Sequence, residues 1–236
     1  RSGVRPLELV LEPLASAEAV LTEAERDAGV MLLDIGGGTT DAAVFMDGSA
    51  WYTAVLPVGG SHITNDIAIG LRAPYDTAEE LKIKHGRASR EGVLADEPIR
   101  VATEAGPQTY LRADLCDIIE ARIEEILLMV RDELREAGYG RLLPAGVVLT
   151  GGTAQLSGLA DLAARIFEMP VRVGTPSDLE GLVDTITGPA FATSVGLVRW
   201  SLSNPYGSGE GVYEDRRSPA PGISNQLKGW LKAFLP

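Results

Sequence analysis

The sequence predicts an α/β fold whose sheet begins with an antiparallel meander. Three short apolar runs, rich in strand-forming residues, follow one another near the start of the chain and are separated by tight turns. Beyond them, amphipathic helical patterns alternate with further strand-like runs. This alternation is typical of helices that pack on a central sheet.

Two glycine-containing turns separate the three opening strands. The expected strands are about 30–35, 40–46 and 51–57, the first two flanking a run of three glycines. Asp47-Gly48 supplies the second turn. The preceding segment, 7–27, reads as strand or helix followed by a surface connection, with Ser16–Leu21 the better helical stretch.

Helical periodicity dominates the remainder of the chain. Helices are expected at about 61–71, 77–88, 114–137, 157–168 and 189–200. Ser61 is the expected N-cap of the first, and Gly138 the expected C-cap of the third. Residues 89–113 are polar and less regular. Further strands are expected at about 99–103, 145–149 and 171–173.

The composition of the chain limits the classes of protein to which it can belong. The chain has 236 residues, 45% of them hydrophobic, which is enough for a sizeable core. A net charge of −12 argues against nucleic acid as a partner. Cys116 is the single cysteine, which excludes an intrachain disulfide and suits a reducing compartment.

The segment Asp34–Asp41 has the residues of a phosphate site. Gly36, Gly37 and Gly38 have no side chains, so their backbone N–H groups can approach a ligand closely, and Thr39 adds a hydroxyl donor. Asp34 is placed to hold the water of a metal ion or to orient an attacking water. The alternative is a glycine-rich hairpin with ordinary turn chemistry. No Walker sequence is present, and a strand rather than a helix follows the glycines.

Two further glycine pairs follow strands. Gly59-Gly60 ends the third strand, and by itself it favours a simple turn into a helix. Gly151-Gly152 follows the strand near 145–149, at a sheet edge where α/β proteins bind ligands. Taken with the first glycine loop, this pair predicts a nucleotide whose phosphates lie at 36–39 and whose nucleoside lies at 151–153.

Glu79 and Lys82 are one helical turn apart and therefore face the same side. They are expected to hold ribose hydroxyls and flank the base. The alternative for such a pair is a solvated surface ion pair, which is the commoner case.

The last fifteen residues form an expected amphipathic helix after a linker rich in serine, proline and glycine. Apolar and basic side chains segregate on this helix, as in helices that lie in a membrane interface. The expected membrane-contacting residues are Ile223, Leu227, Lys228, Trp230, Leu231, Lys232 and Phe234. The alternative is docking on the protein's own core, against which the long linker argues.

The ordered set of motifs resembles the FtsA family of bacterial actin-like cell-division proteins. The matching segments are Asp34–Asp41, Gly59–Ala68, Ala78–Gly86 and Val148–Gly152, and the resemblance covers essentially the whole chain. It implies an actin-like ATPase fold of the actin, Hsp70 and ribonuclease H-like type, with ATP and Mg²⁺ as cofactors. By resemblance, the nucleotide residues are Asp34, Gly36, Gly37, Gly38, Thr39, Gly59, Glu79, Lys82, Gly151 and Gly152.

The resemblance also implies partners. Such a protein polymerises, binds the C-terminal tail peptide of FtsZ and other division proteins, and tethers FtsZ filaments to the cytoplasmic face of the anionic inner membrane at the septum. Arg122, with Glu125, lies at the family's position for the FtsZ peptide, although Arg122 could equally form an ion pair on its own helix.

The chain is expected to correspond to the C-terminal half of these proteins. The expected units are 1–60 with 146–200 as subdomain IIA, 61–145 as subdomain IIB, 201–221 as a flexible linker and 222–236 as the membrane helix. The family's first phosphate loop does not occur in this sequence, which implies at most weak ATPase activity. A pilus-assembly protein of the PilM type and a fragment of an Hsp70-type ATPase are the alternatives.

Overall fold

The computed structural model describes residues 8–103, 105–140, 143–177, 179 and 185–203. Residues Val10–Leu202 form one compact unit. Most of the predicted linker and all of the predicted membrane helix, including every residue expected to contact a membrane, lie outside the described residues. Within the described part of the chain, no helix is both long and apolar enough to cross a membrane.

A mixed five-stranded sheet confirms the predicted meander. Its order is β3-β2-β1-β6-β7, with β1, β2 and β3 antiparallel and β6 and β7 parallel to β1. The strands are β1 (Val30–Ile35), β2 (Thr40–Met46), β3 (Ser49–Leu56), β6 (Val147–Thr150) and β7 (Val171–Val173). Asp47 and Gly48 both take positive φ angles in the turn between β2 and β3, as the Asp-Gly sequence predicts.

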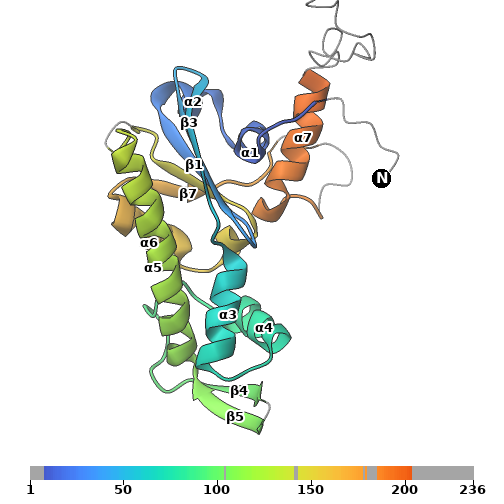
Figure 1. Ribbon diagram of the computed structural model, residues 1–236, viewed down its shortest axis with the longest axis vertical. Helices are drawn as coiled ribbons and strands as arrows, with labels where there is room; N and C mark the ends of the chain where they lie inside the picture. The colour runs from blue at the N-terminus through green and yellow to red at the C-terminus, as the bar shows by residue number, and fades with distance from the viewer. Residues whose placement is uncertain (1–7, 104, 141–142, 178, 180–184, 204–236) are drawn as a thin grey trace, which may run out of the picture. The chain divides into compact units, whose positions relative to one another are not determined.

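Helices cover both faces of the sheet (Figure 1). On one face, α1 (Glu12–Val20) and α7 (Ala192–Ser203) pack on Leu32 and its neighbours. On the other, α3 (Gly60–Gly70), α5 (Arg112–Glu136) and α6 (Leu159–Phe167) share a core with Met31 and Leu33. Because side chains alternate along a strand, β1 supplies both cores. Asp34 is therefore on the same side as Leu32, toward α1 and α7.

Residues 60–140 add helices and a small hairpin beyond the sheet (Figure 1). After α3 comes α4 (Tyr75–His85), followed by β4 (Pro98–Thr103) and β5 (Gly106–Leu111), which pair with each other. Within the less regular segment 89–113 the sequence predicted the strand at about 99–103 but missed β5. Most β5 residues are exposed, so the strand carries no apolar alternation that would reveal it.

Several predicted element ends differ from the structure. Gly59, not Ser61, is the N-cap of α3. The backbone N–H of Gly59 donates to Nδ1 of His62 at 3.2 Å, so the turn is capped without the Ser61 hydroxyl. The helix predicted at about 157–168 is confirmed as α6, and a 3₁₀ turn, η1 (Gly152–Gln155), precedes it. A second 3₁₀ turn, η2 (Pro189–Phe191), precedes α7.

The predicted boundary of the linker at residue 201 was wrong by three residues, because α7 continues through Ser203. The hydroxyl of Ser201 donates to the carbonyl of Val198 at 2.8 Å. A serine that bonds to the preceding turn can remain helical, so the change in composition does not mark the helix end.

Arginine side chains fix the C-terminal end of α1. Its last four carbonyls accept hydrogen bonds from Arg26 (to Ala17), Arg199 (to Glu18 and Ala19) and Arg172 (to Val20). Because the last carbonyls of a helix lack helical partners and carry partial negative charge, these cations stabilise the helix end. Thr22 and Glu25 form a capping box at the start of α2 (Glu23–Ala28). Glu25 also forms an ion pair with Arg172.

Candidate functional site

Asp34 is buried at the end of β1, between α1 and α7. Its Oδ2 accepts a hydrogen bond from the hydroxyl of Ser16 at 2.7 Å and lies 3.4 Å from the hydroxyl of Thr193. Burial raises the pKa of this carboxyl, and repulsion from Asp41 adds to the effect, while the hydrogen bonds from Ser16 and Thr193 oppose it. The structure thus holds Asp34 in a fixed orientation through helices from both ends of the chain.

Glu12 is a nearby acid that the sequence prediction missed. Partial desolvation of its carboxyl, with repulsion from Asp41 and Asp34, raises its pKa. The sequence does contain a feature that could have identified Glu12: it directly follows the apolar run Leu9-Val10-Leu11, just as Asp34 follows an apolar run. Among the described residues, no three or more histidine, cysteine, aspartate or glutamate side chains are grouped so that they could hold a metal ion.

In the glycine hairpin between β1 and β2, the carbonyls of Gly36 and Gly37 accept hydrogen bonds, and two backbone N–H groups are open. The carbonyl of Gly36 accepts from Gly60 N at 2.9 Å, and that of Gly37 accepts from Ser61 N at 2.8 Å. The amide of Gly36 donates to Thr39, whereas those of Gly37 and Gly38 donate to no residue in the described part of the chain. A Cβ built on Gly37 or Gly38 would meet no atom within 4 Å.

Gly59 and Gly151 have structural reasons to be glycine. A Cβ on Gly59 would lie 2.7 Å from the carbonyl oxygen of Gly36. Gly151 has φ +86, and its Cβ would lie 2.4 Å from Oδ1 of Asp34. The first residue lets α3 approach the hairpin, and the second lets the loop after β6 approach Asp34.

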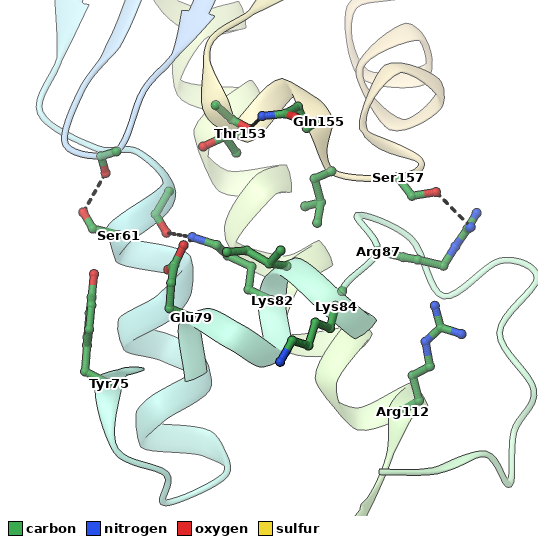
Figure 2. Close-up of a pocket in the computed structure, with 16 residues that line it drawn as sticks. Ser61, Tyr75, Glu79, Lys82, Lys84, Arg87, Arg112, Thr153, Gln155 and Ser157 are labelled. Carbon is green, nitrogen blue, oxygen red and sulfur yellow. Dashed lines mark hydrogen bonds and ion pairs between the residues drawn. The ribbon is translucent and has the colours of Figure 1, made fainter. Parts of the chain in front are cut away.

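Beside the hairpin lies a cavity of about 760 Å³, shown in Figure 2. Of the predicted nucleotide residues, Gly37, Glu79, Lys82 and Gly152 line it; Asp34, Gly36, Gly38, Thr39, Gly59 and Gly151 do not. Other lining residues come from α3, α4, the start of α5 and the loop after β6. The hydroxyl of Thr153 donates to the carbonyl of Gly36 at 3.2 Å, so the two glycine loops are joined directly.

Glu79 and Lys82 form a partly buried pair rather than a solvated one. The Lys82 ammonium lies 2.8 Å from Oε2 of Glu79 and also donates to the carbonyl of Gly60 and the hydroxyl of Thr64. Although burial raises the pKa of Glu79, hydrogen bonds from Lys82 and Thr64 outweigh it and lower the pKa. These bonds use Oε2, which leaves Oε1 to accept a hydrogen bond from a ligand hydroxyl.

Arg122 and Glu125 lie on α5, apart from the cavity. The guanidinium of Arg122 binds both carboxylate oxygens of Asp66 on α3, with Nη2 3.0 Å from Oδ1, and its Nη1 also donates to Glu125. Hydrogen bonding to Asp66 raises the pKa of Arg122. The charge of Arg122 is therefore compensated by two carboxylates, those of Asp66 and Glu125. Glu125 is on the same helix, so the predicted alternative of an ion pair within that helix is confirmed.

Comparison with solved structures identifies the fold. MreB5 of Spiroplasma citri bound to ADP superposes with a TM-score of 0.67 at 18% identity, over 81% of this chain and 59% of that one. A PilM-PilN type IV pilus biogenesis complex superposes with a TM-score of 0.64 at 21% identity, over 85% of this chain and 55% of that one. Identities this low show the fold alone, which is the actin-like ATPase fold.

Comparison of sequences identifies the family. The family described as cell division protein FtsA matches residues 31–196. Cell division protein FtsA of Pseudomonas aeruginosa is 41% identical over 98% of this chain, and the match covers 57% of that protein's own length. The chain thus spans about half the length of the curated relatives it matches. On this evidence, the chain belongs to the FtsA family of cell-division proteins.

Proposed function

We propose that this protein binds ATP with its phosphates on the glycine hairpin and its nucleoside in the adjoining cavity. The proposal rests on the backbone of Gly37 and Gly38. Their N–H groups have no partner among the described residues, and neither φ nor packing requires glycine at these positions. Glycine costs about 0.5–1 kcal/mol relative to alanine where no special conformation is needed. Close approach of an anion to the backbone explains that cost.

The cavity residues take distinct roles in this proposal. Oε1 of Glu79 accepts from a ribose hydroxyl, while Lys82 holds the Glu79 carboxylate in place. Gly152, without a side chain, lets the nucleoside lie against the backbone. These contacts bind and orient the nucleotide.

Asp34 fits the indirect role that the sequence predicts. Mg²⁺ is usually held by one or two carboxylates together with phosphates and waters, so a single oriented carboxylate suits it. When bound, Mg²⁺ would neutralise phosphate charge. Asp34, held by Ser16, would accept a hydrogen bond from a water of the ion or from an attacking water. We propose at most weak ATPase activity for this chain.

Replacing Gly37 by alanine tests the nucleotide site. The variant should keep or slightly raise its free energy of unfolding, because open space surrounds the new methyl group. Its affinity for ATP should fall about tenfold or more, because the methyl group keeps the phosphate from the backbone N–H, and a hydrogen bond to a charged group contributes about 1.5–3 kcal/mol. Equilibrium dialysis with labelled ATP measures this. Gly188→Ala, outside the cavity and at φ −72, is the control. Equal ATP affinity in both variants would contradict the proposal.

We further propose that the protein polymerises and tethers FtsZ filaments to the membrane at the septum. Its membership of a cell-division family and its actin-like fold support this role. The proposal assigns 1–60 with 146–200 to subdomain IIA and 61–145 to subdomain IIB. It assigns the FtsZ tail peptide to the surface around Arg122 and Glu125, where an acidic peptide would compete with Asp66 for the guanidinium. Pull-down with that peptide separates this role from that of a PilM-like protein.

Deleting residues 222–236 tests the tether. The sequence predicts a helix there whose lysines lie opposite or at the edge of its apolar side. Such a helix favours weak binding to anionic lipid that polymerisation strengthens. We expect the protein to co-sediment with anionic liposomes and the deletion variant to remain in the supernatant. Co-sedimentation that is unchanged by the deletion would remove the tether from the proposal.

A further inference from the structure

The two edges of the five-stranded sheet are built differently. β7, at one edge, is three residues long, and its central residue Arg172 is charged and pairs with Glu25. β3, at the other edge, is eight residues long. No charged residue occurs from Gly48 to Ser61, although 23% of the chain is charged. Because short length and charge are the usual protection of an edge strand, β7 is protected against pairing with another strand and β3 is not.

One face of β3 is packed and the other is open. On the packed face, Leu56 is buried, and the hydroxyl of Tyr52 donates to Glu133 on α5. On the open face, Thr53 and Val55 are exposed, Val55 by 61%. Among the described strands, β3 pairs with β2 alone. The strand is therefore held in place by one face while its outer backbone edge is open to a partner.

The pairing of β3 with β2 defines the regular part of this edge. Tyr52–Leu56 pair one to one with Thr40–Val44, whereas Trp51 is the extra residue of a β-bulge next to Tyr52. A bulge bends the strand and interrupts the ladder. A new strand can therefore pair regularly only with Tyr52–Leu56.

A second copy of the same strand fits this segment. In an antiparallel pair with two-fold symmetry, only the register centred on Ala54 pairs all five regular residues with one another. It places Thr53 opposite Val55 of the second copy and Tyr52 opposite Leu56 of the second copy. All of these side chains are uncharged, and Thr53 and Val55 are β-branched residues that favour strands. The contact therefore buries no charge in either copy.

We infer that β3 is a self-association surface, through which two copies of the chain join their sheets by antiparallel pairing of Tyr52–Leu56 about a two-fold axis at Ala54. A two-fold contact closes on itself, so it goes beyond the proposed polymerisation, which requires a contact that repeats. Five residues from each copy form a small interface, which makes the association weak. Because each copy has a net charge of −12 and the contact contains no ion pair, added salt should strengthen it.

Val55→Lys tests the surface by sedimentation equilibrium of the whole 236-residue chain without nucleotide. The unsubstituted protein should form a reversible dimer whose dissociation constant falls as salt is added. Lysine on an edge strand opposes pairing, so the variant should dimerise at least about tenfold more weakly. Ile69→Lys is the matched control, because it adds the same charge at a 70% exposed position on α3. It should dimerise like the unsubstituted protein.

Cysteine variants test the register. Residues directly opposite in antiparallel strands have Cα atoms about 4.5–5.5 Å apart, within reach of a disulfide, whereas diagonal neighbours are about 7–8 Å apart. On oxidation with copper phenanthroline, Ala54→Cys should therefore form a disulfide-linked dimer. Thr53→Cys and Val55→Cys should crosslink only when the two variants are mixed. The native Cys116 is buried and is present in every variant.

Three results would overturn the inference. They are a protein that stays monomeric at all protein and salt concentrations, a dimer that Val55→Lys leaves intact, and an Ala54→Cys variant that crosslinks no faster than Thr53→Cys alone. Should Val55→Lys not fold by circular dichroism, Thr53→Lys, at the other exposed position of the pair, should weaken the dimer equally. None of these results bears on the nucleotide site, which the ATP affinity of Gly37→Ala tests separately.

Discussion

Replacing Gly196 by alanine is expected to destabilise the protein by about 3 kcal/mol, the upper part of the range for overpacked cores. A Cβ on this residue would lie 1.7 Å from the carbonyl oxygen of Ala15 and 2.4 Å from its carbon. Those atoms belong to the backbone of α1, so the clash is relieved only by moving α1 away from α7. The expected sign is opposite to that of an ordinary helical Gly→Ala change, which stabilises by about 1 kcal/mol.

Urea unfolding followed by circular dichroism measures this effect. Ser194→Ala, at an exposed position of the same helix, is the control and should change the free energy of unfolding by less than about 0.5 kcal/mol. A Gly196→Ala variant as stable as the unsubstituted protein would contradict the close contact of α1 and α7. That contact also positions the site, because Ser16 on α1 and Thr193 on α7 both bond to Asp34.

Replacing Arg172 by methionine should lower stability by about 1–2 kcal/mol at neutral pH. The guanidinium donates to both carboxylate oxygens of Glu25, at 2.6 and 2.7 Å, and to the carbonyl of Val20 at 2.8 Å. Methionine keeps much of the apolar stem and removes these bonds. The arginine side chain is 41% exposed, and solvent screening therefore keeps the expected loss of stability small.

The loss should depend on pH. Hydrogen bonding to Arg172, although burial opposes it, lowers the pKa of Glu25 from its ordinary value of 4.5 to about 2. Because the folded state has the lower pKa, the stabilisation is fully present above pH 4.5 and disappears as the pH falls toward 2. The difference in free energy of unfolding between the two proteins should shrink across that interval.

Thermal unfolding at several pH values tests the Arg172 prediction. Lys84→Met breaks an exposed pair with Glu80. Because solvent screens such a pair, the free energy of unfolding should stay the same as that of the unsubstituted protein at every pH. A loss for Arg172→Met that stays constant between pH 5 and 2 would show that Glu25 is not the partner that matters.

The elements that local sequence determines were predicted well. The strands β1, β2 and β7 begin and end as expected, because short apolar runs between glycine turns fix both their type and their ends. In contrast, β5 pairs with the adjacent strand β4, and most of its residues are exposed. The cap of α3 depends on a distant segment, because Gly59 packs on the backbone of Gly36. Neither contact leaves a periodic pattern in the sequence.

The sequence predicted which residues belong to the candidate site, but it did not predict how they are arranged in space. Motif spacing identified Gly37, Glu79, Lys82 and Gly152, which the structure brings to one cavity. Asp34 belongs to the same prediction, yet alternation along β1 directs it toward α1 and α7. Glu12 went unrecognised, since a single charged residue in the sequence reads as a solvated side chain unless its neighbours in space are known.

The most direct test of the proposed nucleotide site is the position of bound ATP, measured by the amide resonances of the ¹⁵N-labelled protein during titration with Mg²⁺ and ATP. The largest shifts are expected at Gly37 and Gly38, where the phosphates would bind, and at Gly152, where the nucleoside would lie. Inorganic triphosphate should shift the first two and leave Gly152 in place. Shifts confined to a separate cavity of about 780 Å³ beside Arg131 and Arg135, with none at Gly37 or Gly38, would contradict the proposed site.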